Sequence, residues 1–427
     1  MNEAQFKAHY SRPEIQEAIA RFCENREAVG RALHGSYFKR PDVIKFQNDV
    51  WALATQSSKP ARSFHASVEL WKNSLSLSTE MTRAELDELR LGWDLLIDLD
   101  SNELAHSKIA ADVCLSALEA HGLRDIPIKF SGRAGFHILI PSKLFPVEWG
   151  GKPMNQQFPD LPRKIAVYFQ DFIKDVFATH LSTAIGEPVE DPFKFVKIDS
   201  ALVTSRHLVR CPYSFHEKTW LVSLPIKRHD VLTFDPETAR PENVKEVVFF
   251  EGGTGSATDI IERAVYFTEE KERERRENEP DKPKITFTGK RDGKVFRVPP
   301  EAFPPCVKNI LEQKDITDCR KRRMGFLQAY LMQAGRSAQE MSDEILTWNA
   351  SLKNPLPSQY VTSQIKSHAK KTKPLMPPNC GNEEMVRVTG VCTPDGLCNG
   401  LKNPIQYSYK RFKAFRRNPE KKRRQKK

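Results

Sequence analysis

The sequence predicts an α+β protein with two folded parts: a larger part built from a sheet and helices, and a smaller, mostly helical part. Three observations predict this division. Strand-like and helix-like patterns of hydrophobic residues alternate between about residues 60 and 230. A run of charged residues with two prolines, TEEKERERRENEPDKPKI, occupies residues 268–285 and predicts a solvated linker or a helix that frays into one. Beyond it lie two helical patterns and then a segment rich in cysteine, proline and glycine.

The elements of the larger part follow from the spacing of their hydrophobic residues. The run Leu95–Ile97 in WDLLIDLD predicts a buried strand. The amphipathic pattern SKIAADVCLSALEAHGL predicts a helix that Gly122 closes. The remaining predicted elements are the strands IPIKFS and FHILIP joined by the turn GRAG, the helix PRKIAVYFQDFIKDVFATHL, and the strands KFVKIDS and WLVSLPI.

The smaller part should contain two helices, CRKRRMGFLQAYLMQAG and SAQEMSDEILTWNASL. Ser337 and Glu340 form a capping-box pattern that opens the second helix. We therefore expect four segments along the chain. They are a sheet-containing domain at 1–255, a charged linker at 256–295, a helical domain at 296–410 and a basic disordered tail at 411–427.

The charge of the chain favours a polyanionic partner. The formal net charge is +12 and the sequence pI is about 9.2, and eleven Lys or Arg residues lie within 410–427. A solubilising tail is the alternative explanation of that cluster. No apolar run approaches the roughly 20 residues that cross a bilayer, and the N-terminus lacks the apolar core of a signal peptide. We therefore expect an intracellular, cytoplasmic protein, associated with the nucleoid and not with a membrane.

Two carboxylates stand at the end of the first buried strand. Asp98 and Asp100 are separated by one residue, so on a strand both side chains point to the same face. Two carboxylates on one face repel each other unless a cation lies between them, and Mg²⁺ or Mn²⁺ suits such oxygen ligands. The alternative is a helix-capping aspartate with a solvated neighbour.

A second group of residues lies in the turn of KFSGRAGFHILI. Glycines let a backbone approach a ligand closely, and Ser131, Arg133 and His137 offer hydrogen-bond donors to phosphate oxygens. Taken alone, the pattern also fits an ordinary hairpin turn with a core histidine. It contains neither a Walker loop nor a Rossmann fingerprint.

A third group lies in VKIDSALVTSRHLVRCPYSFHEKT. Asp199 ends an apolar strand, and Arg206, His207, Arg210 and His216 follow it. One more carboxylate beside several basic side chains is the composition that a two-metal nucleotidyl-transfer site requires.

Together the three groups resemble the catalytic subunit of archaeo-eukaryotic primases, over about residues 60–228. That family has a D-x-D on a strand, an S-G-R-x-G-x-H turn, and an Asp followed by R-H-L-x-[KR]-x-P-[YF]-S-x-H. The resemblance implies a primase catalytic fold, which is an RRM-like mixed sheet with helices. It also implies that Asp98, Asp100 and Asp199 bind two divalent cations, Mg²⁺ or Mn²⁺. Nucleotide contacts, mainly to the phosphates, are implied for Ser131, Arg133, His137, Arg210 and His216.

The match departs from the family pattern at one place. Many members insert a cysteine-rich zinc element between the second and third motifs, whereas residues 132–198 contain no cysteine. We therefore expect no zinc site in the catalytic domain. The resemblance assigns no role to His207, which could equally pack in the core.

Five of the eight cysteines lie in the last third of the chain. Cys306, Cys380, Cys392 and Cys398 are separated by 73, 11 and 5 residues. This spacing does not select a metal, because four thiolates hold either one zinc ion or an iron–sulfur cluster. We expect the fifth, Cys319, to be a buried free thiol.

The last third also resembles the C-terminal domain of the primase large subunit, over about residues 296–410. The shared order is Pro-Pro-Cys, a basic helix, an acidic helix with tryptophan, Pro-Pro-x-Cys and C-x5-C near Asn-Pro. In that family four cysteines hold a [4Fe–4S] cluster in a helical domain, which the resemblance implies for Cys306, Cys380, Cys392 and Cys398. The basic groups at 320–323, with Lys366, His368, Lys370 and Lys371, are expected to bind the template or the initiating triphosphate.

The two resemblances imply a single-chain DNA primase. This enzyme would be a nucleotidyltransferase that releases pyrophosphate and starts short primers on single-stranded DNA, as the archaeal-type primases do. Its partners would be the template, NTPs or dNTPs, the RNA/DNA primer duplex, and a replicative helicase or polymerase. Three alternatives remain: a primase-polymerase or repair polymerase that extends existing ends, an inactive nucleic-acid-binding protein, and a zinc-stabilised basic scaffold.

Overall fold

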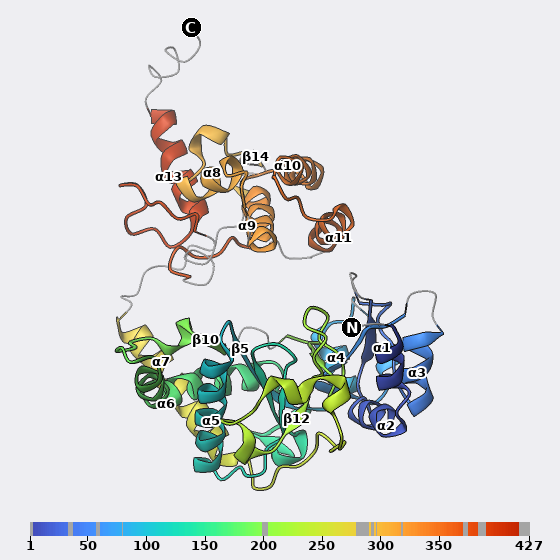
Figure 1. The fold of residues 1–427 in the computed structure, drawn as a ribbon. Coiled ribbons are helices and arrows are strands. Elements are labelled where there is room, and N and C mark those ends of the chain that lie inside the picture. Colours follow the sequence, from blue (N-terminus) through green and yellow to red (C-terminus); the bar gives the residue numbers. More distant parts are fainter. Residues whose placement is uncertain are drawn as a thin grey trace. The chain divides into compact units, whose positions relative to one another are not determined.

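The computed structural model divides the chain into two compact units, residues 1–281 and 282–427 (Figure 1). Each unit has its own hydrophobic core. The structure describes residues 3–32, 37–56, 60–78, 80–198, 204–278, 290–291, 294–295, 297–316, 319–369, 375–382 and 390–417.

A five-stranded sheet forms the centre of the first unit. Its strands lie in the order β10 (Val196–Ile198), β5 (Leu95–Ser101), β7 (Phe136–Ile140), β6 (Ile128–Phe130) and β12 (Pro225–Ile226). All strand pairs that the described residues form in this sheet are antiparallel, rather than mixed as expected. The reason is that the β6–β7 hairpin folds back and places β7 between β5 and β6, which would otherwise be parallel neighbours.

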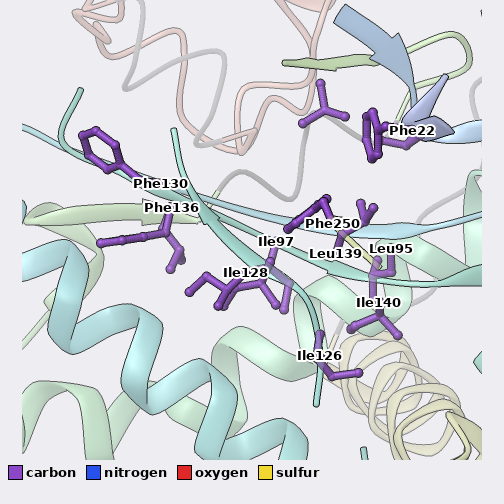
Figure 2. Packing of buried hydrophobic residues seen from close by; sticks show 14 of the residues in the cluster. Phe22, Leu95, Ile97, Ile126, Ile128, Phe130, Phe136, Leu139, Ile140 and Phe250 are labelled. Atoms are coloured by element: carbon purple, nitrogen blue, oxygen red, sulfur yellow. The ribbon is translucent and has the colours of Figure 1, made fainter. Parts of the chain in front are cut away.

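Helices cover one face of this sheet. Helix α5 (Leu104–Ala120) packs on β5 and β7, α6 (Asp160–Ile185) packs on α5, and α7 (Thr258–Asn278) packs on α6, so the three lie side by side (Figure 1). The strand residues that face them are hydrophobic and buried. Figure 2 shows Ile97, Ile128 and Ile140 among these side chains.

A second, three-stranded sheet carries the other half of the candidate site. It consists of β1 (Ala28–Arg31), β2 (Ser63–Ser67) and β11 (Leu208–Arg210). The remaining helices of the unit are α1 (Glu3–Tyr10), α2 (Pro13–Phe22), α3 (Gln47–Thr55) and α4 (Arg83–Leu89), and its two-stranded ribbons are β3 (Glu69–Trp71) with β4 (Arg90–Trp93) and β8 (Glu148–Trp149) with β9 (Lys152–Pro153).

The linker was predicted to begin at residue 256, which is too early in the chain. Residues 258–278 form helix α7, and Ile260, Ile261 and Ala264 in its first turns are buried in the core of the first unit. Residues 268–278, the first part of the charge run that suggested a linker, occupy the later turns of the same helix.

The second unit is mostly helical, as predicted. It contains the ribbon β13 (Lys290–Arg291) and β14 (Lys294–Val295), and the helices α8 (Pro305–Glu312), α9 (Arg320–Gln333), α10 (Ala338–Ala350), α11 (Ser358–Ala369) and α13 (Pro404–Arg417). The predicted capping box is present, because Glu340 N–H donates to Ser337 Oγ at 3.2 Å and Ser337 N–H donates to the Glu340 carboxylate at 2.9 Å. Helix α13 extends through Arg417, so the basic tail expected from residue 411 begins inside a helix.

Candidate functional site

Strand β5 presents its two carboxylates on the face of the sheet away from the helices. Leu95, Ile97 and Leu99 are buried, whereas Asp98 is partly exposed and Asp100 is exposed. The alternation of a strand therefore turns both carboxylates to one side, as the sequence predicted. Asp100 lies directly opposite Lys197 of β10.

The β6–β7 hairpin brings His137 beside the first carboxylate. His137 lies directly opposite Asp98 in the strand register, and its Nε2 is 3.4 Å from Asp98 Oδ1. Ser131 N–H donates to the carbonyl of Gly135 at 2.9 Å and closes the turn.

Two glycines of this turn are required by close contacts. Gly132 has a φ of +103°, and a Cβ there would lie 2.6 Å from the Cβ of His216. A Cβ on Gly135 would lie 2.1 Å from the carbonyl oxygen of Leu99, between Asp98 and Asp100 in the chain. The glycines therefore let the turn approach both the carboxylate strand and the segment that carries His216.

The three-stranded sheet supplies the basic side of the site. Arg210 of β11 lies directly opposite His65 of β2. Arg210 donates from Nη1 to the carbonyl of Phe215 at 2.6 Å and from Nη2 to Glu217 at 2.8 Å. Glu217 also forms an ion pair with Arg31, whose Nη1 lies 3.0 Å from its carboxylate. The guanidinium of Arg210 is thus held in one orientation by two acceptors.

These elements enclose one small cavity of about 260 Å³. It gathers seven predicted site residues and His207: Asp98, Asp100, Ser131, Arg133, His137, His207, Arg210 and His216. Tyr37 and His65 also line it. Asp199 falls outside the described residues. The metal and nucleotide roles assigned to the lining residues stay predictions.

The environment of the site keeps His65, His137 and His216 neutral and Glu217 charged. Burial, with Arg210 next in effect, lowers the pKa of His216 to about 4 and the pKa of His65 well below its usual range. Burial also lowers the pKa of His137, and Lys129 and Arg210 lower it further. Burial raises the pKa of Glu217, but the hydrogen bond and the charge of Arg210 outweigh it and hold that pKa well below the usual value.

Sequence reasoning missed the contributions of Tyr37, His65 and Glu217. Glu217 directly follows the third motif, so its position next to His216 was an available signal. Tyr37 and His65 lie more than 30 residues before the first motif in the sequence. No local pattern marks them, because strand pairing alone brings β2 next to β11.

Arg206 has a structural role despite its place in the third motif. Its guanidinium donates to both oxygens of the buried Glu27, at 2.9 and 2.6 Å, and Arg40 donates to the same carboxylate. Arg40 also donates to the carbonyl of Arg206 at 2.8 Å. This network fixes the backbone just before β11 and hence the start of the strand that carries Arg210.

The four predicted cluster ligands lie near one another in the second unit. Burial, and after it the charges of Cys380, Cys392 and Cys398, raise the pKa of the Cys306 thiol to about 12. Asn309 of α8 donates to the carbonyl of Val391 at 2.9 Å, and Cys380 N–H donates to the carbonyl of Lys402 at 2.8 Å. Helix α8 and the segments around residues 380, 391 and 402 are thereby held together.

The four cysteines are less closely grouped than the ligands of a complete metal site. Within the described ranges, no group of three or more His, Cys, Asp or Glu side chains is arranged to hold a metal ion. The donor set nevertheless fits a four-thiolate site in its chemistry. Cys319 directly precedes α9 and is partly exposed, not buried as expected.

The basic residues of α9 divide between surface and core. Lys321 and Arg322 are exposed. Arg323 is buried and donates to Gln313 Oε1 at 2.6 Å, so it is removed from the predicted nucleic-acid surface. Lys370 and Lys371 lie outside the described residues, and Lys366 is exposed.

The candidate site is distinguished by the residues that line it, not by its volume. A larger cavity of about 900 Å³ lies between α2, the start of α3 and the region after β3, and none of the motif residues lines it. In the part of the chain that the structure describes, no helix is both long and apolar enough to span a membrane.

Comparisons with known proteins give only remote similarities. No family model matches the sequence, and no curated protein matches it significantly. The structure is similar to the polymerase domain of ligase D from Mycobacterium tuberculosis in complex with DNA, with 14% identity and a TM-score of 0.35 over 61% of this chain and 88% of that chain. It is also similar to the primase RepB′, with 12% identity and a TM-score of 0.32 over 84% of this chain and 95% of that chain.

Proposed function

We propose that the chain is a DNA primase whose first unit carries out template-directed nucleotidyl transfer. The observation that carries the proposal is the cavity between the two sheets. Asp98 and Asp100 line it together with Arg133, Arg210 and His216. Carboxylates that can hold divalent cations and basic groups that can hold a triphosphate are the two requirements of this reaction.

The carboxylates fit the proposed metal. Asp98 and Asp100 supply oxygen ligands from a rigid strand, and Asp199 is the proposed third ligand. Two Mg²⁺ or Mn²⁺ ions bound there would lower the pKa of the attacking 3′-hydroxyl and neutralise the leaving pyrophosphate.

The basic side of the cavity would bind the incoming nucleotide. Arg210, fixed by Phe215 and Glu217, can donate to phosphate oxygens without first being ordered. Arg133 and His216 stand on the two segments that Gly132 brings together. Ser131 and His137 add donors from the same hairpin. These residues would orient the triphosphate and face the negative charge that develops at the phosphoryl oxygens.

For the second unit we propose a [4Fe–4S] cluster held by Cys306, Cys380, Cys392 and Cys398. The mutual effect of these thiols on the pKa of Cys306 supports it. Protein purified without oxygen should contain iron and sulfide in about equal amounts. Stoichiometric zinc without iron would overturn the cluster and leave a zinc site on the same cysteines.

The proposed substrates are a single-stranded DNA template and NTPs or dNTPs, with the primer duplex as product. The exposed Lys321 and Arg322 of α9 and the net charge of +12 support binding to the phosphate backbone. A replicative helicase or polymerase would take over the finished primer.

Synthesis without a primer is the test. The full-length chain is incubated with single-stranded template, Mg²⁺ or Mn²⁺ and labelled nucleotides, with and without a primer. Short products that begin without a primer are expected. Products that appear only with a supplied primer would favour a polymerase that extends existing ends, and template binding without any product would favour an inactive binding protein.

A further inference from the structure

Lys129 is a buried lysine that the proposed reaction does not use. It lies in β6 and is 0% exposed. Its Nζ is hydrogen-bonded to His137 Nδ1 at 2.7 Å and to Ser223 Oγ at 2.8 Å, and the ring of Phe250 lies 5.7 Å away. No described carboxylate forms an ion pair with it. Because a buried ammonium without a counterion is unfavourable, packing alone does not explain a lysine here.

Strand register connects this lysine to the candidate site. Lys129 lies directly opposite His137, and His137 lies directly opposite Asp98. Directly opposed residues of antiparallel strands share a face, so the three side chains form one row across β6, β7 and β5. The imidazole is the middle member: its Nδ1 faces the lysine, and its Nε2 faces Asp98 at 3.4 Å.

The available hydrogens determine which ring nitrogen is protonated. Ser223 donates its single hydroxyl hydrogen to the carbonyl of Phe130 at 2.9 Å, so it accepts from Lys129. Burial lowers the pKa of Lys129 to about 7, so the charged form is present at and below neutral pH. In that form the ammonium group only donates, so His137 Nδ1 must accept from Lys129 as well. The ring proton is then on Nε2. The Asp98 carboxylate only accepts, and therefore favours the same tautomer from the other side.

We propose that Lys129 is a positioning residue that fixes the ring of His137 as its Nε2–H tautomer. His137 then presents a hydrogen-bond donor, not a lone pair, to a phosphate oxygen of the incoming nucleotide. The tautomer itself follows from the contacts of Lys129, Ser223 and Asp98. Only the phosphate that receives the donor rests on the proposed function.

A purely structural lysine predicts a different result on substitution. Lys129→Met keeps the aliphatic length and removes the ammonium. Because removal of an unpaired buried charge is neutral or stabilising, we expect this variant to fold with an unchanged or raised melting temperature. Loss of nucleotide affinity without loss of stability therefore separates positioning from a role in folding.

The direct test is the ring state of His137, measured without nucleotide. The full-length chain is labelled with ¹⁵N in its histidine rings, and His137→Gln identifies the signal. Below neutral pH, where Lys129 is charged, we expect a neutral ring that is Nε2–H in the wild type. In Lys129→Met we expect a mixture of Nε2–H and Nδ1–H, because Asp98 alone still favours Nε2–H. An Nδ1–H ring in the wild type overturns the proposal without any variant, and so does an unchanged ring in Lys129→Met.

Ser223→Ala is the matched control, because it removes the other partner of Lys129 and leaves the contact with His137. It should keep the Nε2–H ring. A shift as large as in Lys129→Met would assign the effect to disturbed packing and contradict the proposal.

The second readout is binding of a non-hydrolysable nucleoside triphosphate with Mg²⁺. We expect Lys129→Met to weaken binding about tenfold, the loss of roughly one good hydrogen bond to a charged group. Unchanged affinity would overturn the role of Lys129 in nucleotide binding. If the wild type binds no nucleotide, the proposed function fails, while the ring measurement still decides how Lys129 acts on His137.

Discussion

At the scale of single residues, the site depends on side chains that hold other side chains. Glu217 accepts from Ser63 and Arg210 and pairs with Arg31, while only 8% of its own side chain is exposed. A buried carboxylate between two guanidinium groups keeps them apart and oriented. Arg210 could be predicted from its motif. The residue that orients it could not, because its partners come from two other strands.

Glu217→Gln should destabilise the first unit by about 3 kcal/mol at neutral pH, because it leaves two guanidinium groups without their counter-charge. The pKa of Glu217 is lower in the folded than in the unfolded state. Its contribution to stability is therefore complete above the unfolded pKa of about 4.5 and is lost as the pH falls below that value. Denaturant unfolding of the wild type and Glu217→Gln measures their free energies of unfolding. The difference between them should be constant between pH 7 and pH 5 and should become smaller below about pH 4.5.

Glu237→Gln is the control for this prediction. Glu237 pairs with Arg240, but both side chains are about half exposed, at 60% and 49%. We expect Glu237→Gln to change the free energy of unfolding by less than about 0.5 kcal/mol. If the difference in the free energy of unfolding between the wild type and Glu217→Gln stays constant down to pH 3, the account of Glu217 is contradicted.

At the scale of elements, much of the first unit followed from the sequence. The strand at 95–101, the helices α5 and α6 and the tight turn at 131–135 all have strong local patterns. No local pattern indicated the pairing of β2 with β11, since the two strands are about 140 residues apart in the sequence. Helix α7 was missed in part because its charged later turns resemble a linker, although its first turns are buried. Local pattern thus predicted elements, and tertiary pairing decided which of them meet.

Gly132 tests the contact between two of these elements. Gly132→Ala should destabilise the first unit and weaken nucleotide binding, since the new Cβ would lie 2.6 Å from His216 Cβ. Gly186→Ala is the matched control, because Gly186 also has a positive φ, +82°, but a Cβ there meets no atom within 4 Å. Thermal unfolding should show that Gly132→Ala loses about 1–3 kcal/mol more stability than Gly186→Ala. Equal losses would show that backbone strain alone is responsible and that the turn does not depend on the contact.

At the scale of the whole molecule, the two units are separate in their cores. The described lining of the candidate site belongs entirely to the first unit, and the four cysteines belong to the second. The sequence predicted two domains because of the change in composition, but it began the linker at residue 256, whereas the first unit continues through helix α7 to residue 281. The separation means that damage to one core should leave the other folded.

Calorimetry of the full chain should therefore resolve two transitions. Cys306→Ser should lower only the transition of the second unit, and so should removal of the proposed cluster by a chelator, since a bound cluster would stabilise the fold that holds it. Cys114→Ser is the reciprocal control, because Cys114 is buried in the first unit and should affect only that transition. A single transition that both substitutions lower would contradict the independence of the two units.

The central claim is that the Asp98 and Asp100 face of β5 carries out nucleotidyl transfer. Its most direct test is the initial rate of primer synthesis on single-stranded DNA without a supplied primer, for the wild type, Asp98→Asn and the control Asp175→Asn. Asp175 lies exposed on α6 and does not line the cavity. We expect synthesis by the wild type and Asp175→Asn, and a loss of at least about a thousandfold in Asp98→Asn, equivalent to about 4 kcal/mol of transition-state stabilisation. Equal rates for the wild type and Asp98→Asn, with normal folding, would contradict the claim.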